Sequence, residues 1–137
     1  MIFLDTNVVS EALSKHPSEA VLSWLERFDP ELALPAMVIA EVAAGIAKIA
    51  PEQRALRLET GLSLWRKRFA GRVFGVTEEV ALIYGTIMGK SVRVGRRMSV
   101  QDGLIAATAL ANRGRLATRN VPDFATTGLD LISPWDF

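Results

Sequence analysis

The sequence predicts an α/β fold in which a mostly parallel central sheet is covered by helices on both faces. Short apolar runs alternate with longer segments of helical periodicity along the chain, which is the order expected of parallel strands joined by helices. The runs 2–4 and 31–34 are apolar almost throughout, as in strands buried on both faces. The length of 137 residues suits one domain, so we expect a single domain over 1–137.

In the first half of the chain, proline and acidic residues separate the predicted elements. Asp5 ends the first apolar run and starts a turn and a helix. The segment 17–28 repeats apolar residues at three- and four-residue steps, which predicts a helix. Pro35 and Pro51 stand where the first turns of two more helices are expected. The predicted elements are strands at 2–4 and 31–34 and helices at 17–28, 36–49 and 51–69.

In the second half, capping residues mark the element ends. Gly71 and Thr77 bracket a third strand, and Thr77 begins a helix. Ser99 caps a strongly apolar helix that Gly114 closes. Between these two helices lies a basic, glycine-containing loop, 93–97. The predicted elements are strands at 72–76, 116–118 and 129–132 and helices at 77–91 and 100–112.

The composition excludes several classes of function. Sixteen Lys and Arg against 15 Asp and Glu give a net charge of +1, which excludes a strongly basic protein that coats nucleic acid. The chain has no cysteine, so disulfide scaffolds, iron–sulfur clusters, zinc thiolate sites and cysteine nucleophiles are excluded. His16 is the one histidine, which excludes multi-histidine metal sites. Catalysis is therefore expected from carboxylates, hydroxyls, amides or lysines.

No segment of the sequence has the pattern of a targeting signal or a membrane span. The start, 1–5, lacks a basic region, and its apolar run stops at a carboxylate. The longest apolar stretch, 32–47, contains Pro35 and Glu41, so it falls short of the roughly 18 uncharged residues that a span needs. We expect a cytoplasmic protein without membrane contact.

Four acidic residues each have a plausible local explanation. Asp5 can cap a helix, and Glu41 can face solvent. Asp102 stands three residues after Ser99, as in a variant capping box. Asp123 lies in a turn that follows a predicted strand.

Taken together, the four acids indicate a cation site. In a parallel sheet, residues that follow strands or open helices meet at one edge. Two carboxylates 4 Å apart repel by roughly 4 kcal/mol at an effective dielectric near 20, so such a cluster is tolerated when a positive charge fills it. Oxygen ligands without His or Cys select Mg²⁺ or Mn²⁺ over zinc. The residues alone thus predict a metal-dependent phosphoryl hydrolase.

The same acidic segments resemble the four motifs of PIN-domain nucleases, above all the VapC/FitB group of type II toxin–antitoxin toxins. The resemblance rests on 4–11 (Leu-Asp-Thr-Asn-Val-Val-Ser-Glu), the segment around Glu41, 101–109 (Gln-Asp-Gly-Leu-Ile-Ala-Ala-Thr-Ala) and 117–124 (Ala-Thr-Arg-Asn-Val-Pro-Asp-Phe). It extends over nearly the whole chain, to the Gly-Leu-Asp-Leu-Ile-Ser-Pro-Trp segment, 128–135.

The resemblance implies a PIN-domain fold with a central parallel five-stranded sheet, and RNA cleavage dependent on Mg²⁺, with Mn²⁺ as a substitute. The acidic positions of the family fall on Asp5, Glu41, Asp102 and Asp123. The resemblance implies that these residues are catalytic and bind the metal. Asp5 and Asp102 are expected to contact the metal, and the other two acids to complete its shell or orient the attacking water. Thr6 and Asn7 match polar positions that support the first acid. Gly103 departs from the family, in which a better helix former is frequent, at a cost of up to about 1 kcal/mol of helix propensity.

The resemblance also implies partners: an RNA substrate, a homodimer and a cognate antitoxin that alone contacts DNA. Three local groups of basic residues are candidates for RNA contact, although they can equally be solvated surface patches. They are Arg66–Arg72, Arg93–Arg97 and Arg113–Arg119.

Two other functions compete with the nuclease. The first is a non-catalytic PIN-fold module that binds RNA or protein, and the presence of all four acids argues against it. The second is a different Mg²⁺ phosphohydrolase, such as a small phosphatase. That class needs a second acid two residues after its nucleophilic Asp, and Asn7 stands there.

Overall fold

The computed structural model describes all 137 residues and has the predicted α/β architecture. Five strands form one sheet in the order β3-β2-β1-β4-β5, and every neighbouring pair is parallel. The first strand of the chain is therefore the central one. The strands are β1 (Ile2–Leu4), β2 (Leu32–Pro35), β3 (Val73–Phe74), β4 (Arg115–Ala117) and β5 (Leu131–Ile132).

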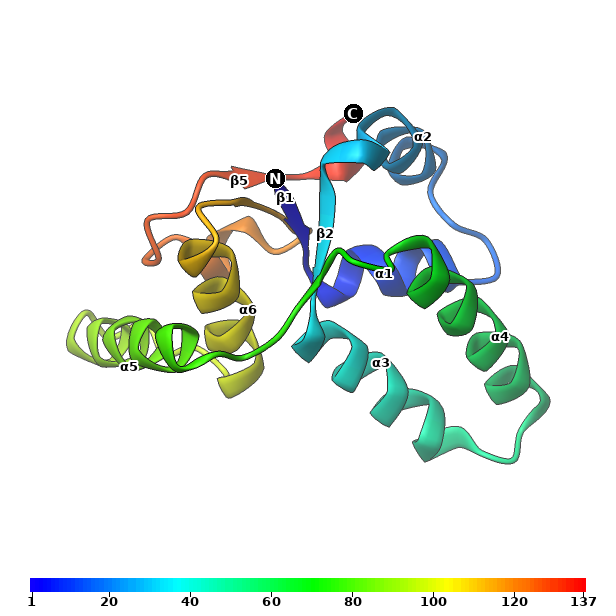
Figure 1. Cartoon of the computed structure of the whole chain (residues 1–137), viewed down its shortest axis with the longest axis horizontal. Coiled ribbons are helices and arrows are strands. Elements are labelled where there is room, and N and C mark those ends of the chain that lie inside the picture. The colour runs from blue at the N-terminus through cyan, green and yellow to red at the C-terminus, as the bar shows by residue number, and fades with distance from the viewer.

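Six α-helices and three short 3₁₀ turns complete the fold. Figure 1 shows α5 and α6 on one side of β1, with α1, α3 and α4 on the other. No helix is long and apolar enough to cross a membrane. The helices are α1 (Thr6–Leu13), α2 (Glu19–Phe28), α3 (Ala36–Ile49), α4 (Gln53–Arg68), α5 (Glu78–Arg93) and α6 (Val100–Ala111); the 3₁₀ turns are η1 (Asp29–Glu31), η2 (Val121–Phe124) and η3 (Pro134–Asp136).

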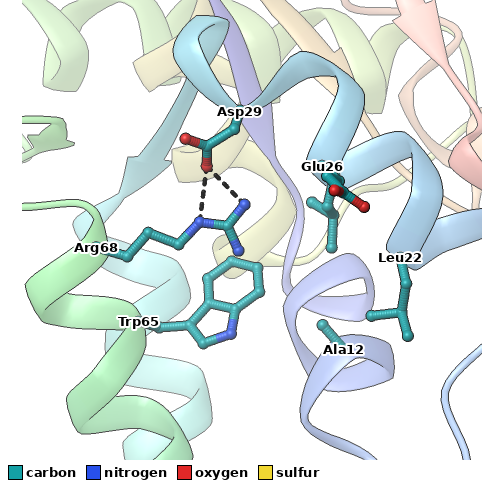
Figure 2. A pocket seen from close by; sticks show the side chains of 7 residues that line it. Ala12, Leu22, Glu26, Asp29, Trp65 and Arg68 are labelled. Atoms are coloured by element: carbon teal, nitrogen blue, oxygen red, sulfur yellow. Dashed lines mark hydrogen bonds and ion pairs between the residues drawn. The ribbon is translucent and has the colours of Figure 1, made fainter.

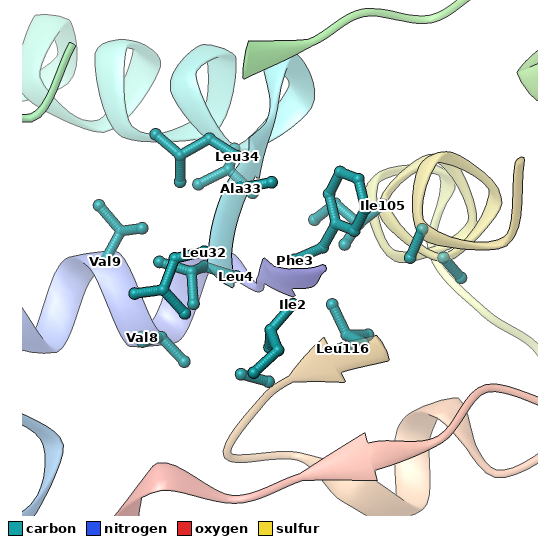
Figure 3. Close-up of a cluster of buried hydrophobic side chains, with 14 of the residues drawn as sticks. Ile2, Phe3, Leu4, Val8, Val9, Leu32, Ala33, Leu34, Ile105 and Leu116 are labelled. Carbon is teal, nitrogen blue, oxygen red and sulfur yellow. The ribbon is translucent and has the colours of Figure 1, made fainter. Parts of the chain in front are cut away.

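The core is built around β1. All three of its side chains are at most 2% exposed, because successive residues of a strand point to opposite faces and both faces are covered. Figure 3 shows Phe3 pointing toward Ile105 of α6, whereas Leu4 lies on the side of α1. The central strand is thereby fixed between two helical layers, and its carboxyl end has a fixed position.

Gly103 allows α5 and α6 to pack closely. A Cβ atom at this position would lie 2.7 Å from Sδ of Met88 and 2.9 Å from Cε1 of Tyr84, shorter than ordinary van der Waals contact. The structure thus explains the departure from better helix formers: the residue after Asp102 must be small because α5 crosses there.

We predict that Gly103→Ala destabilises the fold, although alanine is the better helix former. The expected loss is about 1–2 kcal/mol in the free energy of unfolding, because the Tyr84 ring has to move, and urea denaturation measures it. Gly85→Ala in α5 is the matched control, since nothing lies within 4 Å of its Cβ position. This control is expected to stabilise by up to about 1 kcal/mol; equal effects in both variants would contradict the packing argument.

Candidate active site

Asp5 is a buried carboxylate at the carboxyl end of β1. It is 4% exposed and caps α1, since its Oδ1 accepts the backbone N–H of Thr6 at 2.8 Å. Its Oδ2 accepts hydrogen bonds from the side-chain amide of Asn7 at 3.0 Å and the hydroxyl of Thr118 at 2.7 Å. Burial raises the pKa of the Asp5 carboxyl and the charge of Glu41 adds to the rise, whereas the three donors oppose it.

Thr118 is a site residue that the sequence analysis does not single out. Leu4 of β1 pairs with Ala117 of β4, so the residues that follow these two strands leave the sheet side by side. Thr118 is fully buried, and its hydroxyl accepts the backbone N–H of Asn120 at 3.0 Å while donating to Asp5. The one signal in the sequence is a polar residue at the end of a predicted strand.

Asn7 and Thr6 connect Asp5 to neighbouring segments. The side-chain oxygen of Asn7 accepts the backbone N–H of Arg119 at 3.1 Å, which holds the segment after β4 against the start of α1. The hydroxyl of Thr6 donates to Oε1 of Glu41 at 2.7 Å. Thr6 therefore binds one carboxylate through its backbone and a second through its side chain.

Glu41 and Asp102 reach the same region from two other helices. Glu41 is half-buried in α3, and Asp102 lies in the first turn of α6, where its N–H donates to the Ser99 hydroxyl at 3.0 Å. The predicted cap by Ser99 is thus present. Burial, together with the negative charges of Asp5, Glu41 and Asp123, raises the pKa of the Asp102 carboxyl to about 6.

One cleft of about 340 Å³ collects five of the six predicted site residues. Asp123 is the exception: it is exposed in η2 and lines an adjoining cleft of about 380 Å³, in which Asp102 also takes part. The first cleft is lined by Asp5, Thr6, Asn7, Ser10, Glu41, Asp102 and Asn120.

The donor set fits a hard divalent cation in its chemistry. None of the four acids forms an ion pair, since the molecule has two salt bridges and both lie elsewhere. As the side chains stand, no three acidic, His or Cys residues are grouped closely enough to form a metal site. Carboxylate and amide oxygens without nitrogen or sulfur ligands suit Mg²⁺ or Mn²⁺.

A separate cavity of about 470 Å³ lies among α1, α2 and α4, away from these acids. Figure 2 shows Arg68 paired with Asp29 above the ring of Trp65. The cavity contains no residue of the acidic clefts, so we do not assign it to the same site.

Comparison with known proteins places the chain in a family. A model of the PIN domain family matches residues 2–126. The VapC ribonuclease Y4jK of Sinorhizobium fredii is 35% identical, with 99% of each chain aligned. The toxin FitB of Neisseria gonorrhoeae is 36% identical, with 98% of this chain and 99% of that protein aligned.

Solved structures agree with this assignment. The crystal structure of FitAcB from Neisseria gonorrhoeae superposes with a TM-score of 0.91 at 34% identity over 100% of both chains. VapBC2 of Rickettsia felis, bound to a DNA fragment from its promoter, gives a TM-score of 0.84 at 25% identity over 97% of this chain and 98% of that one. The chain therefore belongs to the PIN domain family and, within it, to the VapC/FitB type.

Proposed function

We propose that this chain is a metal-dependent endoribonuclease and the toxin of a type II toxin–antitoxin pair. The observation that carries the proposal is the convergence of Asp5, Glu41 and Asp102 from three elements on one cleft, without an ion-pair partner. Carboxylates that gather without a counter-ion repel one another, and a bound cation would relieve that repulsion. The ribonuclease name of the relative from Sinorhizobium fredii supports RNA as the substrate.

The proposed site assigns a task to each residue. Asp5 and Asp102 would hold Mg²⁺ or Mn²⁺, with Glu41 and Asp123 completing the shell or orienting the attacking water. When bound, such an ion supplies a nucleophilic water at neutral pH and neutralises charge on the phosphodiester. Thr118 and Asn7 keep Asp5 in one orientation through their hydrogen bonds, which limits the rearrangement needed to bind the ion.

The titles of the neighbouring structures support a protein partner. FitAcB and VapBC2 carry two-component names, and VapBC2 was crystallised with promoter DNA. We propose that this chain likewise binds a cognate antitoxin, that DNA contact occurs through the antitoxin, and that the chain forms a homodimer.

Cleavage of RNA by the purified chain, free of antitoxin, is the direct test. We predict cleavage that requires Mg²⁺ or Mn²⁺ and falls by at least about 100-fold in Asp5→Asn and Asp102→Asn, because lost metal ligands cost more than lost outer-shell partners. Asp136→Asn, an exposed acid outside the clefts, is the control. Variants that cleave like the wild type would refute the site, and RNA left intact under all conditions would favour a non-catalytic binding module.

The ends of the cleaved RNA test the mechanism separately. Attack by water is expected to leave a 5′-phosphate and a 3′-hydroxyl, which end-labelling and mass spectrometry distinguish. A 2′,3′-cyclic phosphate would show instead that the 2′-hydroxyl of the RNA attacks the phosphorus.

The burial of Asp102, together with repulsion from the neighbouring carboxylates, predicts how the metal-free protein responds to pH. Asp102 has a pKa of about 6 in the fold against an ordinary value of 3.8, so the folded state binds its proton more tightly than the unfolded state. The resulting stabilisation is present below about pH 4 and is lost as the pH rises through 6. Urea denaturation with a chelator present is expected to show a falling free energy of unfolding over this range.

Asp102→Asn removes the titrating group, so we expect it to flatten this decline and to be more stable than the wild type at pH 7.5 without metal. Asp136→Asn is again the control and should retain the decline of the wild type. If the free energy of unfolding of Asp102→Asn falls as steeply with pH as that of the wild type, the Asp102 carboxyl is not the group that causes the decline.

A further inference from the structure

Two of the four basic residues in 66–72, Arg68 and Arg72, are engaged in contacts within the molecule. Arg68 pairs with Asp29 at 2.6 Å (Figure 2). Arg72 donates to the backbone carbonyls of Asp29 and Leu32 at 2.6 and 3.1 Å. No residue of this group lines a cleft that contains one of the four acids, so the group does not border the site.

In the group 113–119, Arg115 and Arg119 have partners outside the acidic site. Arg115 pairs with Asp130 at 2.7 Å, and the guanidinium of Arg119 lies 5.1 Å from the ring centroid of Trp135. Only the backbone N–H of Arg119 serves the site, through Asn7. No basic residue of these two groups lines a cleft that contains one of the four acids.

The loop 93–97 is different, because Arg96 and Arg97 line the cleft that contains Asp102 and Asp123. The guanidinium of Arg96 donates to the carbonyl of Pro122 at 3.1 Å, which fixes the loop against η2. Arg97 is exposed and forms no ion pair. A positive charge without an ion-pair partner thus lines the cleft that contains Asp102 and Asp123.

A second set of free positive charges lies at the other end. A groove of about 590 Å³ among α1, α3 and α4 shares Thr6, Ser10 and Glu41 with the acidic cleft. Three of the residues that line this groove are basic, exposed and without an ion-pair partner. They are Lys15, Arg54 and Arg57, the last donating to the carbonyl of Leu13 at 3.2 Å.

Shared lining residues connect the three hollows in a row, which we call the path. Asp102 lines both the cleft of the 93–97 loop and the cleft that contains Asp5. Glu41 lines both the cleft that contains Asp5 and the groove near Lys15. Carboxylates therefore occupy the middle, with free cations at both ends. A polyanion is repelled by the middle section, so cations on both sides are needed to hold it across the carboxylates.

We propose that the path binds one strand of RNA, with Arg97 holding the backbone on one side of the scissile phosphate and Lys15 and Arg54 holding it on the other. This inference rests on the proposed function. The groove near Lys15 also has apolar walls, formed by Val42, Ile46 and their neighbours. Unpaired bases can lie against such walls, whereas a duplex presents its charged backbone outward.

The test measures binding of a short, fluorescently labelled single-stranded RNA, by anisotropy, with a chelator present to prevent cleavage. Each lost phosphate contact lowers the slope of log K against log salt by roughly 0.7 for single strands. We expect a decrease of about 0.7 for Arg97→Gln and about 1.4 for the double variant Lys15→Gln, Arg54→Gln. Arg66→Gln, an exposed arginine outside the three hollows, should retain the slope of the wild type.

Cleavage kinetics give a second readout. The same variants are expected to raise KM for RNA and leave kcat nearly unchanged, because contacts away from the reacting phosphate bind substrate and transition state alike. Thermal melting checks that each variant is folded; these exposed side chains form no ion pair, so Tm should stay close to that of the wild type.

Failure of this inference is distinguishable from failure of the proposed function. If the wild type neither binds nor cleaves RNA, both are refuted. If the wild type binds and cleaves RNA and the variants keep its salt slope and KM, the path is refuted. These basic residues would then be candidates for contact with a protein partner. If the salt slope and KM change for the variants at one end and not for those at the other, a strand that crosses the whole path is refuted.

Discussion

The buried carboxylate of Asp5, at the end of the central strand, is the constraint on which the rest of the site depends. A charge removed from water is costly unless donors replace the lost hydration. Here the donors come from the start of α1, through Thr6 and Asn7, and from the end of β4, through Thr118. A shift of β4 by one residue would remove the Thr118 hydroxyl from Asp5, so strand register, helix cap and site form a single arrangement.

The carboxylates around Asp5 act against the stability of the fold that holds them. Asp102 opens a helix at a favourable position for a negative charge, yet its pKa rises to about 6 because of burial and the acids nearby. The Ser99 cap and the close packing at Gly103 hold this helix end in place despite the repulsion. Favourable packing thus maintains an unfavourable arrangement of charges, as the proposed cation site would require.

The fold could be predicted from the sequence, whereas contacts between distant segments could not. Alternating apolar runs and capping residues located the strands and helices, although β3 is confined to 73–74. In the sequence, Thr118 is simply the last residue of a predicted strand. Its hydrogen bond to Asp5 could not be predicted, since it depends on pairing with a strand more than a hundred positions away. Gly103 looked like a loss of helix propensity because the reason for it lies on α5.

The grouping of charged residues in space was likewise not predictable from their order in the sequence. Clusters of arginine along the sequence drew attention to 66–72, whereas Lys15 and Arg54, far apart in sequence and in no cluster, line one groove. Net charge is equally uninformative: a value of +1 gives the whole protein little long-range attraction for RNA. At physiological salt the Debye length is about 8 Å, so mainly the charges that border the path would act on a strand bound as we propose. Their position, rather than their number, therefore decides whether a phosphodiester can rest over a cluster of carboxylates.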